Sequence, residues 1–265
     1  MVVAIFGCGP AGLFVAQAAE QMGHEIVIIS RKVKSKIYGA QYLHEPIPDL
    51  SPPKPQGEIK TYRLGSAAGY AARVYKDGKR RTSFEYGPTD PVPAWNLRTT
   101  YDRAWEKFES RINHELLDGN DVAQFTAICD VLISTIPLWS LCLRPDIHKF
   151  NSVATMVAPR MEYTGLQAYF GDNTNGVVYN GTSYGYWYRT SHIFGYSSTE
   201  AVSSPEFLHQ HRDAEPGFKV VDNTCDCHPE LHKLGRMGKW KSGVLTHHAY
   251  KEALQLLSET AITRR

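Results

Sequence analysis

Three glycines near the start of the chain are spaced for binding a pyrophosphate. The pattern G-x-G-x-x-G is formed by Gly7, Gly9 and Gly12. In such a loop the first glycine permits a tight turn, the second lets phosphate approach the backbone, and the third lets a helix pack on a strand. Free N–H groups at the start of that helix bind the phosphates. The predicted dinucleotide contacts are Gly7, Gly9, Pro10, Ala11 and Gly12.

The segments on both sides of this loop have the character needed to position it. Residues 2–6 are a continuous apolar run, typical of a parallel strand buried on both faces. Residues 11–22 are rich in helix formers, and residues 25–29 are typical of a second strand. Strand, loop, helix and strand within about thirty residues predict a right-handed βαβ unit. We therefore expect an α/β fold built on a Rossmann-like parallel sheet.

Later segments indicate a return to this sheet and a second sheet. Prolines between residues 46 and 57 predict a loop, and apolar spacing predicts a helix within 94–117. Residues 130–137 are typical of another buried strand, the Tyr-, Thr- and Val-rich residues 153–199 predict an antiparallel sheet, and residues 246–260 predict a final helix. We expect one unit, in which residues 1–45, 120–140 and 233–265 bind the cofactor and the inserted residues 46–119 and 141–232 face the substrate.

Basic residues gather at one point of the insertion, between residues 76 and 81. Asp77-Gly78 lies between the strand-like residues 72–75 and 82–86, which predicts a hairpin with a charged, solvated tip. Contact with phosphate or nucleic acid is the alternative interpretation.

The composition is that of a soluble globular protein, neither disordered nor fibrous. Of its 265 residues 42% are hydrophobic and 21% charged, and the net charge of +2 is too small for a protein that coats nucleic acid. No apolar run is long enough to cross a membrane, and the N-terminus lacks the pattern of a signal peptide. Five irregularly spaced cysteines do not form a disulfide framework. We therefore expect a cytoplasmic protein.

The residues after the second strand leave the identity of the dinucleotide open. An acidic residue that would bind the adenosine ribose is expected there, but the sequence reads Ser30-Arg31-Lys32. Arg31 and Lys32 favour the 2′-phosphate of NADP. Ser30 or the backbone can instead bind the free ribose hydroxyl of FAD.

Three further segments resemble parts of UDP-galactopyranose mutase and its relatives among the FAD-binding oxidoreductases of the FAD/NAD(P)-binding Rossmann superfamily. Residues 38–44 look like the segment beside the flavin ring, and residues 130–138 are similar to the strand that closes the cofactor domain. Residues 235–250 resemble the closing glycine-arginine motif, after which a helix points its N-terminus at the flavin. The resemblance implies FAD rather than NADP. It adds Gly39, Ala40, Gln41, Arg236, Leu245 and Thr246 as cofactor contacts, beside Ser30 and Arg31 after the second strand.

Departures from the mutase argue against its sugar isomerisation. Gln41 stands where the mutase has a flavin-side histidine, an acidic residue of the closing segment is missing, and the chain is shorter. The chain is also similar to short bacteriophage flavoproteins that modify nucleotides or DNA bases. We expect an FAD-dependent oxidoreductase that exchanges hydride at flavin N5 with a small amine, hydroxyl, sugar or nucleotide derivative. The alternatives are a non-redox isomerase or lyase using reduced flavin, an NADP-dependent reductase, and a non-catalytic cofactor-binding protein.

Two residues are candidates for catalysis. Arg189 lies in an aromatic-rich strand and can bind a substrate carboxylate or phosphate through its guanidinium fork. Alternation along that strand predicts Tyr188 and Arg189 on opposite faces. His44 titrates near neutrality and is a candidate acid or base. Plain core packing is the alternative for the strand, and a structural hydrogen bond is the alternative for His44.

A cluster near the C-terminal end of the insertion has residue types that bind metal. It comprises Cys225, Cys227, His228 and His232. Their spacing does not match a familiar zinc pattern. We predict a hydrogen-bonded turn and no bound metal there.

Overall fold

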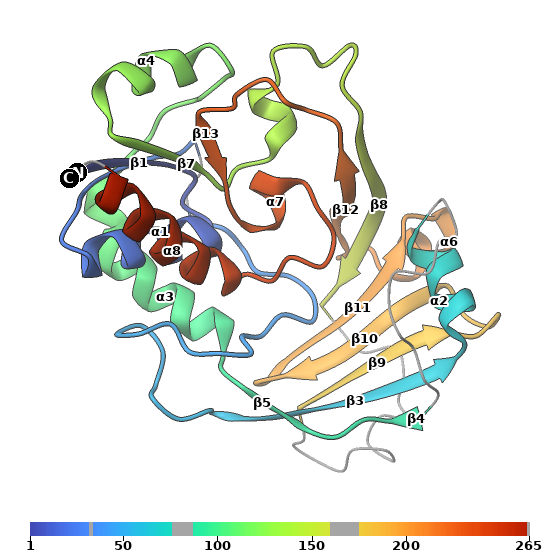
Figure 1. Ribbon diagram of the computed structural model, residues 1–265. Coiled ribbons are helices and arrows are strands. Elements are labelled where there is room, and N and C mark those ends of the chain that lie inside the picture. The colour runs from blue at the N-terminus through green and yellow to red at the C-terminus, as the bar shows by residue number, and fades with distance from the viewer. Residues whose placement is uncertain (32–33, 76–86, 160–174, 264–265) are drawn as a thin grey trace.

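The chain forms two β-sheets that lie side by side (Figure 1). The computed structural model describes residues 1–31, 34–75, 87–159 and 175–263. The first sheet is entirely parallel and has the strand order β13-β7-β1-β2-β6. Its strands are β1 (Val2–Phe6), β2 (Glu25–Ile29), β6 (Ile112–Asn113), β7 (Val131–Ser134) and β13 (Leu231–Lys233). The predicted Rossmann-like parallel sheet is confirmed.

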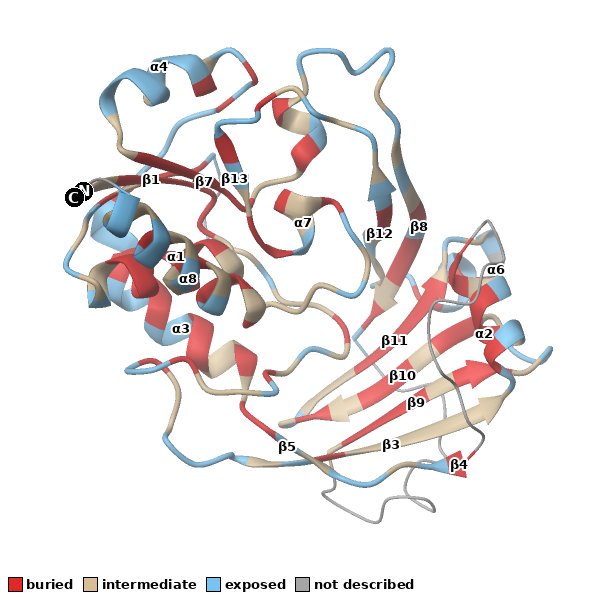
Figure 2. Cartoon of the chain, in the orientation of Figure 1, coloured by how far each residue is buried: buried red, intermediate tan, exposed pale blue. Residues whose placement is uncertain are grey.

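Helices cover both faces of the first sheet, so its central strand is buried on both sides. On one face lie α1 (Pro10–Gln21), α3 (Leu97–Phe108) and α8 (His248–Thr263), and on the other α4 (Asp121–Ile128) (Figure 1). In β1, Val3 and Ile5 pack into the core shared with α1, α3 and α8. Phe6 and its neighbour Ala4 pack with Val122 of α4. This two-sided burial, seen in Figure 2, explains the uninterrupted apolar run of residues 2–6.

The second sheet has eight strands in the order β12-β8-β11-β10-β9-β3-β4, with β5 paired to β3. Its described pairs are antiparallel except for β3 with β9, which is parallel. The strands are β3 (Gly57–Gly65), β4 (Gly87–Pro88), β5 (Val92–Ala94), β8 (Phe150–Ala158), β9 (Gly176–Gly181), β10 (Trp187–Ile193), β11 (Tyr196–Val202) and β12 (Glu215–Asn223). The shorter helices are α2 (Ala67–Val74), η1 (Glu109–Arg111), η2 (Leu138–Leu141), α6 (Pro205–Gln210) and α7 (Gly235–Lys239).

The boundary expected at residue 119 does not follow the packing of the first sheet. Helix α3 and strand β6 belong to the first sheet and its covering layer, not to the insertion. The apolar face of α3, with Tyr101, Trp105 and Phe108, packs into the same core as α1. The assignment of α3 to the first sheet depends on packing between helices that are distant in sequence. The apolar spacing within α3 predicts a buried face but does not indicate which helix packs against it.

The predicted strand over residues 72–75 is also wrong, because residues 67–74 form helix α2. The helix starts at Ser66, whose side chain accepts a hydrogen bond of 3.0 Å from the Gly69 amide. A Cβ atom at Gly69 would lie 2.0 Å from the Gly181 carbonyl oxygen, so helix and strand approach closely there. The basic residues 76–81, Lys32 and residues 160–174 lie outside the described residues.

Among the helices that the structure describes, none combines the length and apolar character needed to cross a membrane.

Candidate functional site

The glycine loop connects β1 to α1, and its three glycines have different roles. Gly7 has a φ of +113°, and a Cβ atom there would lie 2.7 Å from Thr135 Oγ1. At Gly12 a Cβ atom would lie 1.9 Å from the Gly7 carbonyl oxygen. Gly9 is different, since among the described residues a Cβ atom would meet only Ser35 Oγ, at 3.9 Å. The first and third glycines are therefore required by packing, and the second faces open space.

Helix α1 begins beside this open space without a side-chain cap. Its N-cap is Gly9, which makes no side-chain hydrogen bond, and Pro10 occupies the first helical position. The first N–H groups of a helix have no partner within the helix and carry partial positive charge. Open space at Gly9 and uncapped N–H groups together fit a pyrophosphate group.

Tyr101 of α3 forms hydrogen bonds with the glycine loop and with Ser35. Its hydroxyl donates to the Cys8 carbonyl at 2.9 Å and accepts from the Ser35 amide at 3.0 Å. Tyr101 is fully buried. The sequence analysis predicted a helix in this region but assigned no role to Tyr101. The available signal was its residue type, because a buried tyrosine needs a partner for its hydroxyl.

The closing segment meets the glycine loop, as the sequence resemblance implies. Gly235 has a φ of +69°, and a Cβ atom there would lie 2.9 Å from the Ala11 Cβ and 3.9 Å from the Ala249 Cβ. A Cβ atom at Gly238 would lie 2.3 Å from the Ser134 carbonyl oxygen at the end of β7. The first turns of α1 and α8 and the end of β7 thus converge at the segment that begins with Gly235.

Buried polar atoms without partners lie on the segments that converge here. The His247 side chain is 4% exposed, and its Nδ1 has no hydrogen-bond partner among the residues that the structure describes. The Ser134 Oγ at the end of β7 is also buried, and no described residue forms a hydrogen bond with it. Burial and the neighbouring His248 lower the pKa of His247 to about 4, so its ring is neutral at pH 7. Such atoms usually have a partner in a functional protein, and a bound polar ligand would supply one.

The other predicted cofactor contacts lie around the same place. Ser30 follows β2, is buried, and its Oγ lies 3.2 Å from the Cys8 Sγ of the glycine loop. Arg31 is exposed. Leu245 and Thr246 form the turn that precedes α8. Arg236 is exposed, and its Nε donates to the Val244 carbonyl at 3.1 Å.

The segment with Gly39, Ala40 and Gln41 is attached to the second sheet. The Ala40 amide donates to Glu200 Oε1 at 3.0 Å. Gly39 has a φ of +76°, and a Cβ atom there would lie 2.7 Å from the same oxygen. Gln41 is exposed, and its Nε2 donates to the Tyr38 carbonyl at 2.6 Å. Glu200 of β11 therefore positions the segment predicted to lie beside the flavin.

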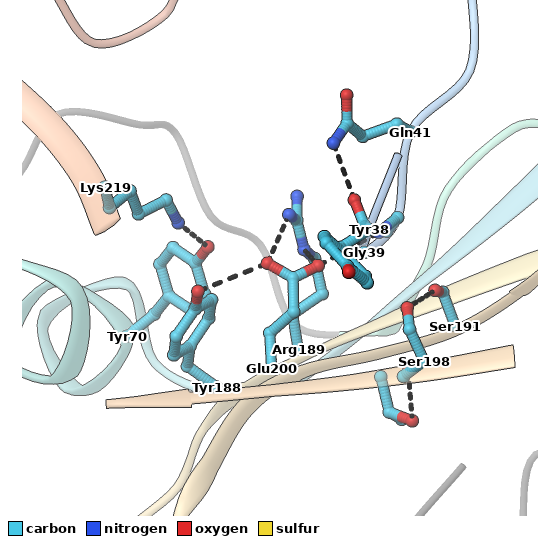
Figure 3. Close-up of polar contacts among 12 residues, drawn as sticks. Tyr38, Gly39, Gln41, Tyr70, Tyr188, Arg189, Ser191, Ser198, Glu200 and Lys219 are labelled. Carbon is cyan, nitrogen blue, oxygen red and sulfur yellow. Dashed lines mark hydrogen bonds and ion pairs between the residues drawn. The ribbon is translucent and has the colours of Figure 1, made fainter. Parts of the chain in front are cut away.

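Glu200 is the centre of a group of charged and phenolic side chains on the second sheet, shown in Figure 3. We call Tyr70, Tyr188, Arg189, Glu200 and Lys219 the buried charge cluster. Glu200 accepts from Arg189 Nε at 2.7 Å, from Arg189 Nη2 at 2.5 Å, and from the Tyr188 hydroxyl at 3.2 Å. Lys219 Nζ donates to the Tyr70 hydroxyl at 3.2 Å.

This arrangement changes the interpretation of Arg189. Two donors of its guanidinium are engaged by Glu200, so the expected fork for a substrate anion is already occupied. The predicted separation of Tyr188 and Arg189 on opposite faces is wrong, because both contact Glu200. A bulge between Trp187 and Arg189 interrupts the alternation of β10.

Glu200 and Lys219 were not among the predicted site residues. The sequence did contain a signal for Glu200. The turn at Phe194 and Gly195 lies midway between positions 189 and 200, so an antiparallel hairpin around this turn places Arg189 opposite Glu200. Lys219 comes from β12, at a distance along the chain that no local pattern bridges.

Electrostatic interactions connect this cluster to the closing segment. Arg236 of the closing segment interacts electrostatically with Arg189 and Glu200. Burial raises the pKa of Tyr42 to about 12, and Tyr42 interacts with both Tyr179 and Arg189. The site thus extends from the start of α8 to the second sheet.

His44 lies on the α8 side of this site. Its ring centroid is 4.6 Å from that of Tyr42 and 5.6 Å from that of His247. Burial and His248 lower the pKa of His44. The structure records no direct contact between His44 and Arg189, the two predicted catalytic residues. Both of them interact with Tyr42.

Lys219 is expected to make the stability of the protein depend on pH. Burial, followed by the charge of Arg189, lowers its pKa to about 7 from an ordinary value of 10.5. Between these two values the unfolded chain binds a proton that the folded chain does not, so the free energy of unfolding rises with pH across this interval. Urea unfolding from about pH 6 to about pH 9 should show this rise in the wild type and lose it in Lys219→Met.

The matched control for this experiment is Lys241→Met, because Lys241 is exposed. That variant should keep the wild-type pH dependence. Equal slopes for wild type and Lys219→Met would show that Lys219 keeps its proton.

Comparison with known proteins identifies the fold. No protein-family model matches the chain, and no curated protein sequence does. Solved structures do match. One, assigned as an FAD-containing monooxygenase from Photorhabdus luminescens subsp. laumondii TTO1, has a TM-score of 0.51 at 11% identity and covers 100% of this chain and 89% of its own.

Two further structures give the same result. The flavin-dependent brominase Bmp2 has a TM-score of 0.50 at 11% identity, with 98% of this chain and 80% of its own covered. CtdE, solved in complex with FAD and a substrate, has a TM-score of 0.50 at 12% identity, and the match covers 97% of this chain and 79% of CtdE. At such identities the likeness establishes the fold alone, and the chain has the fold of these flavoproteins.

Proposed function

We propose that this chain is an FAD-dependent oxidoreductase that acts on a small polar substrate. The observation that carries the proposal is the convergence of the glycine loop, the starts of α1 and α8, and the segment from Gly235 around open space at Gly9. Two helix starts and unpartnered buried polar atoms suit an anionic, polar cofactor. The fold shared with an FAD-containing monooxygenase, a flavin-dependent brominase and CtdE, which was solved with FAD, supports FAD over other dinucleotides.

The residues would hold the cofactor in the following way. The backbone at Gly7, Gly9 and Gly12, with the start of α1 at Pro10 and Ala11, would bind the pyrophosphate. Ser30, with Arg31 nearby, would bind the adenosine ribose. Leu245, Thr246 and the start of α8 would stabilise negative charge on the flavin. Further contacts with the cofactor would come from Gly39, Ala40, Gln41 and Arg236. Bound FAD would supply two-electron redox chemistry through hydride exchange at N5.

The substrate side of this site is the buried charge cluster. Glu200 attaches the segment of Gly39 to the second sheet, and Arg189 holds Glu200 in place. Arg189 is thus a positioning residue in this proposal. Lys219, with a pKa of about 7, can donate or accept a proton near neutral pH. His44, on the opposite side, is the second candidate for proton transfer.

Polar groups of this kind suit a substrate with hydroxyl, amine or carbonyl functions. We propose a small metabolite, sugar or nucleotide derivative, including a modified nucleotide or DNA base. Stopped-flow reduction and reoxidation of the bound flavin across such compounds would identify the class. A substrate-dependent spectral change without net oxidation would indicate a non-redox isomerase or lyase, and no change with any compound would indicate a binding protein.

Purified protein is expected to be yellow and to release FAD when denatured. Adding FAD to apo-protein should raise its melting temperature, because a ligand bound by the native state stabilises it by about 2.7 kcal/mol at a hundred times its Kd. Absorbance, mass spectrometry of the released cofactor and thermal shift would measure this. NADPH alone should have much less effect. A colourless protein stabilised by NADPH but not by FAD would leave a nicotinamide-dependent reductase in place of the flavoenzyme, in line with Arg31 after β2.

A further inference from the structure

Four metal-binding side chains from two distant segments meet at one point outside the proposed flavin site. They are Cys142, His148, Cys225 and Cys227, and their candidate ligand atoms all lie within 4.8 Å of one another. Cys142 follows η2, and His148 precedes β8. The other two cysteines lie between β12 and β13. The cluster therefore joins two connections of the chain.

The distances among Cys142, His148 and Cys227 match the edges of a tetrahedral site. The Sγ atoms of Cys142 and Cys227 are 3.9 Å apart, and His148 Nδ1 lies 3.2 Å from the first and 3.4 Å from the second. Zinc binds thiolate sulfur at about 2.3 Å and imidazole nitrogen at about 2.0 Å, which gives edges of about 3.8 Å between sulfurs and about 3.5 Å between sulfur and nitrogen. Three thiols and one imidazole are a donor set that zinc uses in structural sites.

The second ring nitrogen of His148 lies beside a carboxylate, as it does in many metal-bound histidines. His148 Nε2 lies 3.3 Å from Asp226 Oδ1 and 3.4 Å from Arg144 Nη2, and the imidazole is only 9% exposed. A proton on Nε2, shared with Asp226, would leave Nδ1 free to bind metal. Asp226 lies between Cys225 and Cys227, so the same loop supplies two ligands and the orienting carboxylate.

The histidines that the sequence suggested as ligands have other positions. His228 Nε2 lies 2.8 Å from the Leu141 carbonyl oxygen, and its Nδ1 lies 3.3 Å from Glu230 Oε1. His232 is exposed in β13. A metal bound by Cys225 and Cys227 would therefore contradict the prediction of no bound metal at Cys225, Cys227, His228 and His232. Cys142 and His148 replace the two histidines.

We propose that Cys142, His148, Cys225 and Cys227 bind one structural zinc ion. The connection from β7 to β8 carries the chain from the first sheet to the second, and the connection from β12 to β13 brings it back. Zinc bound by ligands from both connections cross-links them beside the junction of the sheets. With four protein ligands the ion has no open coordination position, so its role is to stabilise the fold rather than to act on substrate.

Elemental analysis of protein made without a metal-binding tag is expected to find about one zinc per chain. Cys142→Ser and Cys227→Ser should lose most of it. The matched controls are Cys129→Ser, which removes a cysteine at the end of α4, and His232→Asn, which removes a histidine outside the cluster; both should keep it. Removing zinc from the wild type with a strong chelator should lower the melting temperature, and adding zinc should restore it.

Cobalt loading tests the site in the wild type, independently of how the serine variants fold. Cobalt(II) in this site should show the absorption bands of a tetrahedral thiolate complex. Two results would overturn the proposal. One is zinc far below one per chain, even after incubation with zinc under reducing conditions. The other is a Cys142–Cys227 disulfide in protein alkylated at the moment of lysis. Neither result depends on flavin, so failure here leaves the proposed function untouched.

Discussion

Replacing Gly9 by valine is expected to abolish FAD binding while the apo-protein keeps its stability. Gly9 has a φ of −68° and a ψ of 176°, which valine adopts readily. Among the described residues the nearest atom to an added Cβ is Ser35 Oγ, at 3.9 Å, so the Cβ itself displaces no described protein atom. It occupies the space where the pyrophosphate would approach the backbone. FAD content should fall to background, and FAD should no longer raise the melting temperature.

Gly12→Val separates packing from ligand binding at the same loop. A Cβ atom at position 12 would lie 1.9 Å from the Gly7 carbonyl oxygen, so this variant should lose stability as well as cofactor. Apo-protein melting temperatures and FAD content of both variants, with Gly9→Ala as an intermediate, would measure the difference. If Gly9→Val retains stoichiometric FAD, the pyrophosphate lies elsewhere and the assigned cofactor site is incorrect.

Glu200→Gln is expected to lower the free energy of unfolding by about 3–5 kcal/mol, the usual cost of leaving a buried charge without its partner. The side chains of Arg189 and Glu200 are only 18% and 7% exposed, and they share two hydrogen bonds. Although burial opposes it, Arg189 holds the pKa of Glu200 below its ordinary value, so the carboxylate is charged at neutral pH. Glutamine keeps the volume and removes the charge. Denaturant unfolding at pH 7 measures the loss.

A double variant tests whether the loss comes from the unpaired charge. Arg189→Met with Glu200→Leu removes both charges and should recover most of the stability. Ser191→Ala is the matched control in the same strand, since it removes only a hydroxyl pair with Ser198. A loss below about 1 kcal/mol in Glu200→Gln would indicate a hydrated, exposed pair instead.

The cofactor-binding half of the fold could be predicted because its signals are local. The run from Val2 to Phe6, the glycines of the loop and the helix formers after Pro10 each determine a conformation from neighbouring residues. The order of the closing motifs likewise indicated that the segment from Gly235 returns to the loop, and the structure places Gly235 beside Ala11. In this part the sequence determined both the elements and their arrangement.

Only the tertiary structure decided the rest of the site. The partner of Arg189 depends on the register of β10 with β11 and on a bulge that cancels the expected alternation. Tyr101 contacts the glycine loop because α3 packs beside α1, and residues 72–74 are helical because α2 packs on Gly181. Cys142 and His148 join Cys225 and Cys227 because two connections between the sheets run side by side. Backbone propensity is a property of a few adjacent residues, whereas these contacts join segments whose approach depends on the packing of the whole chain.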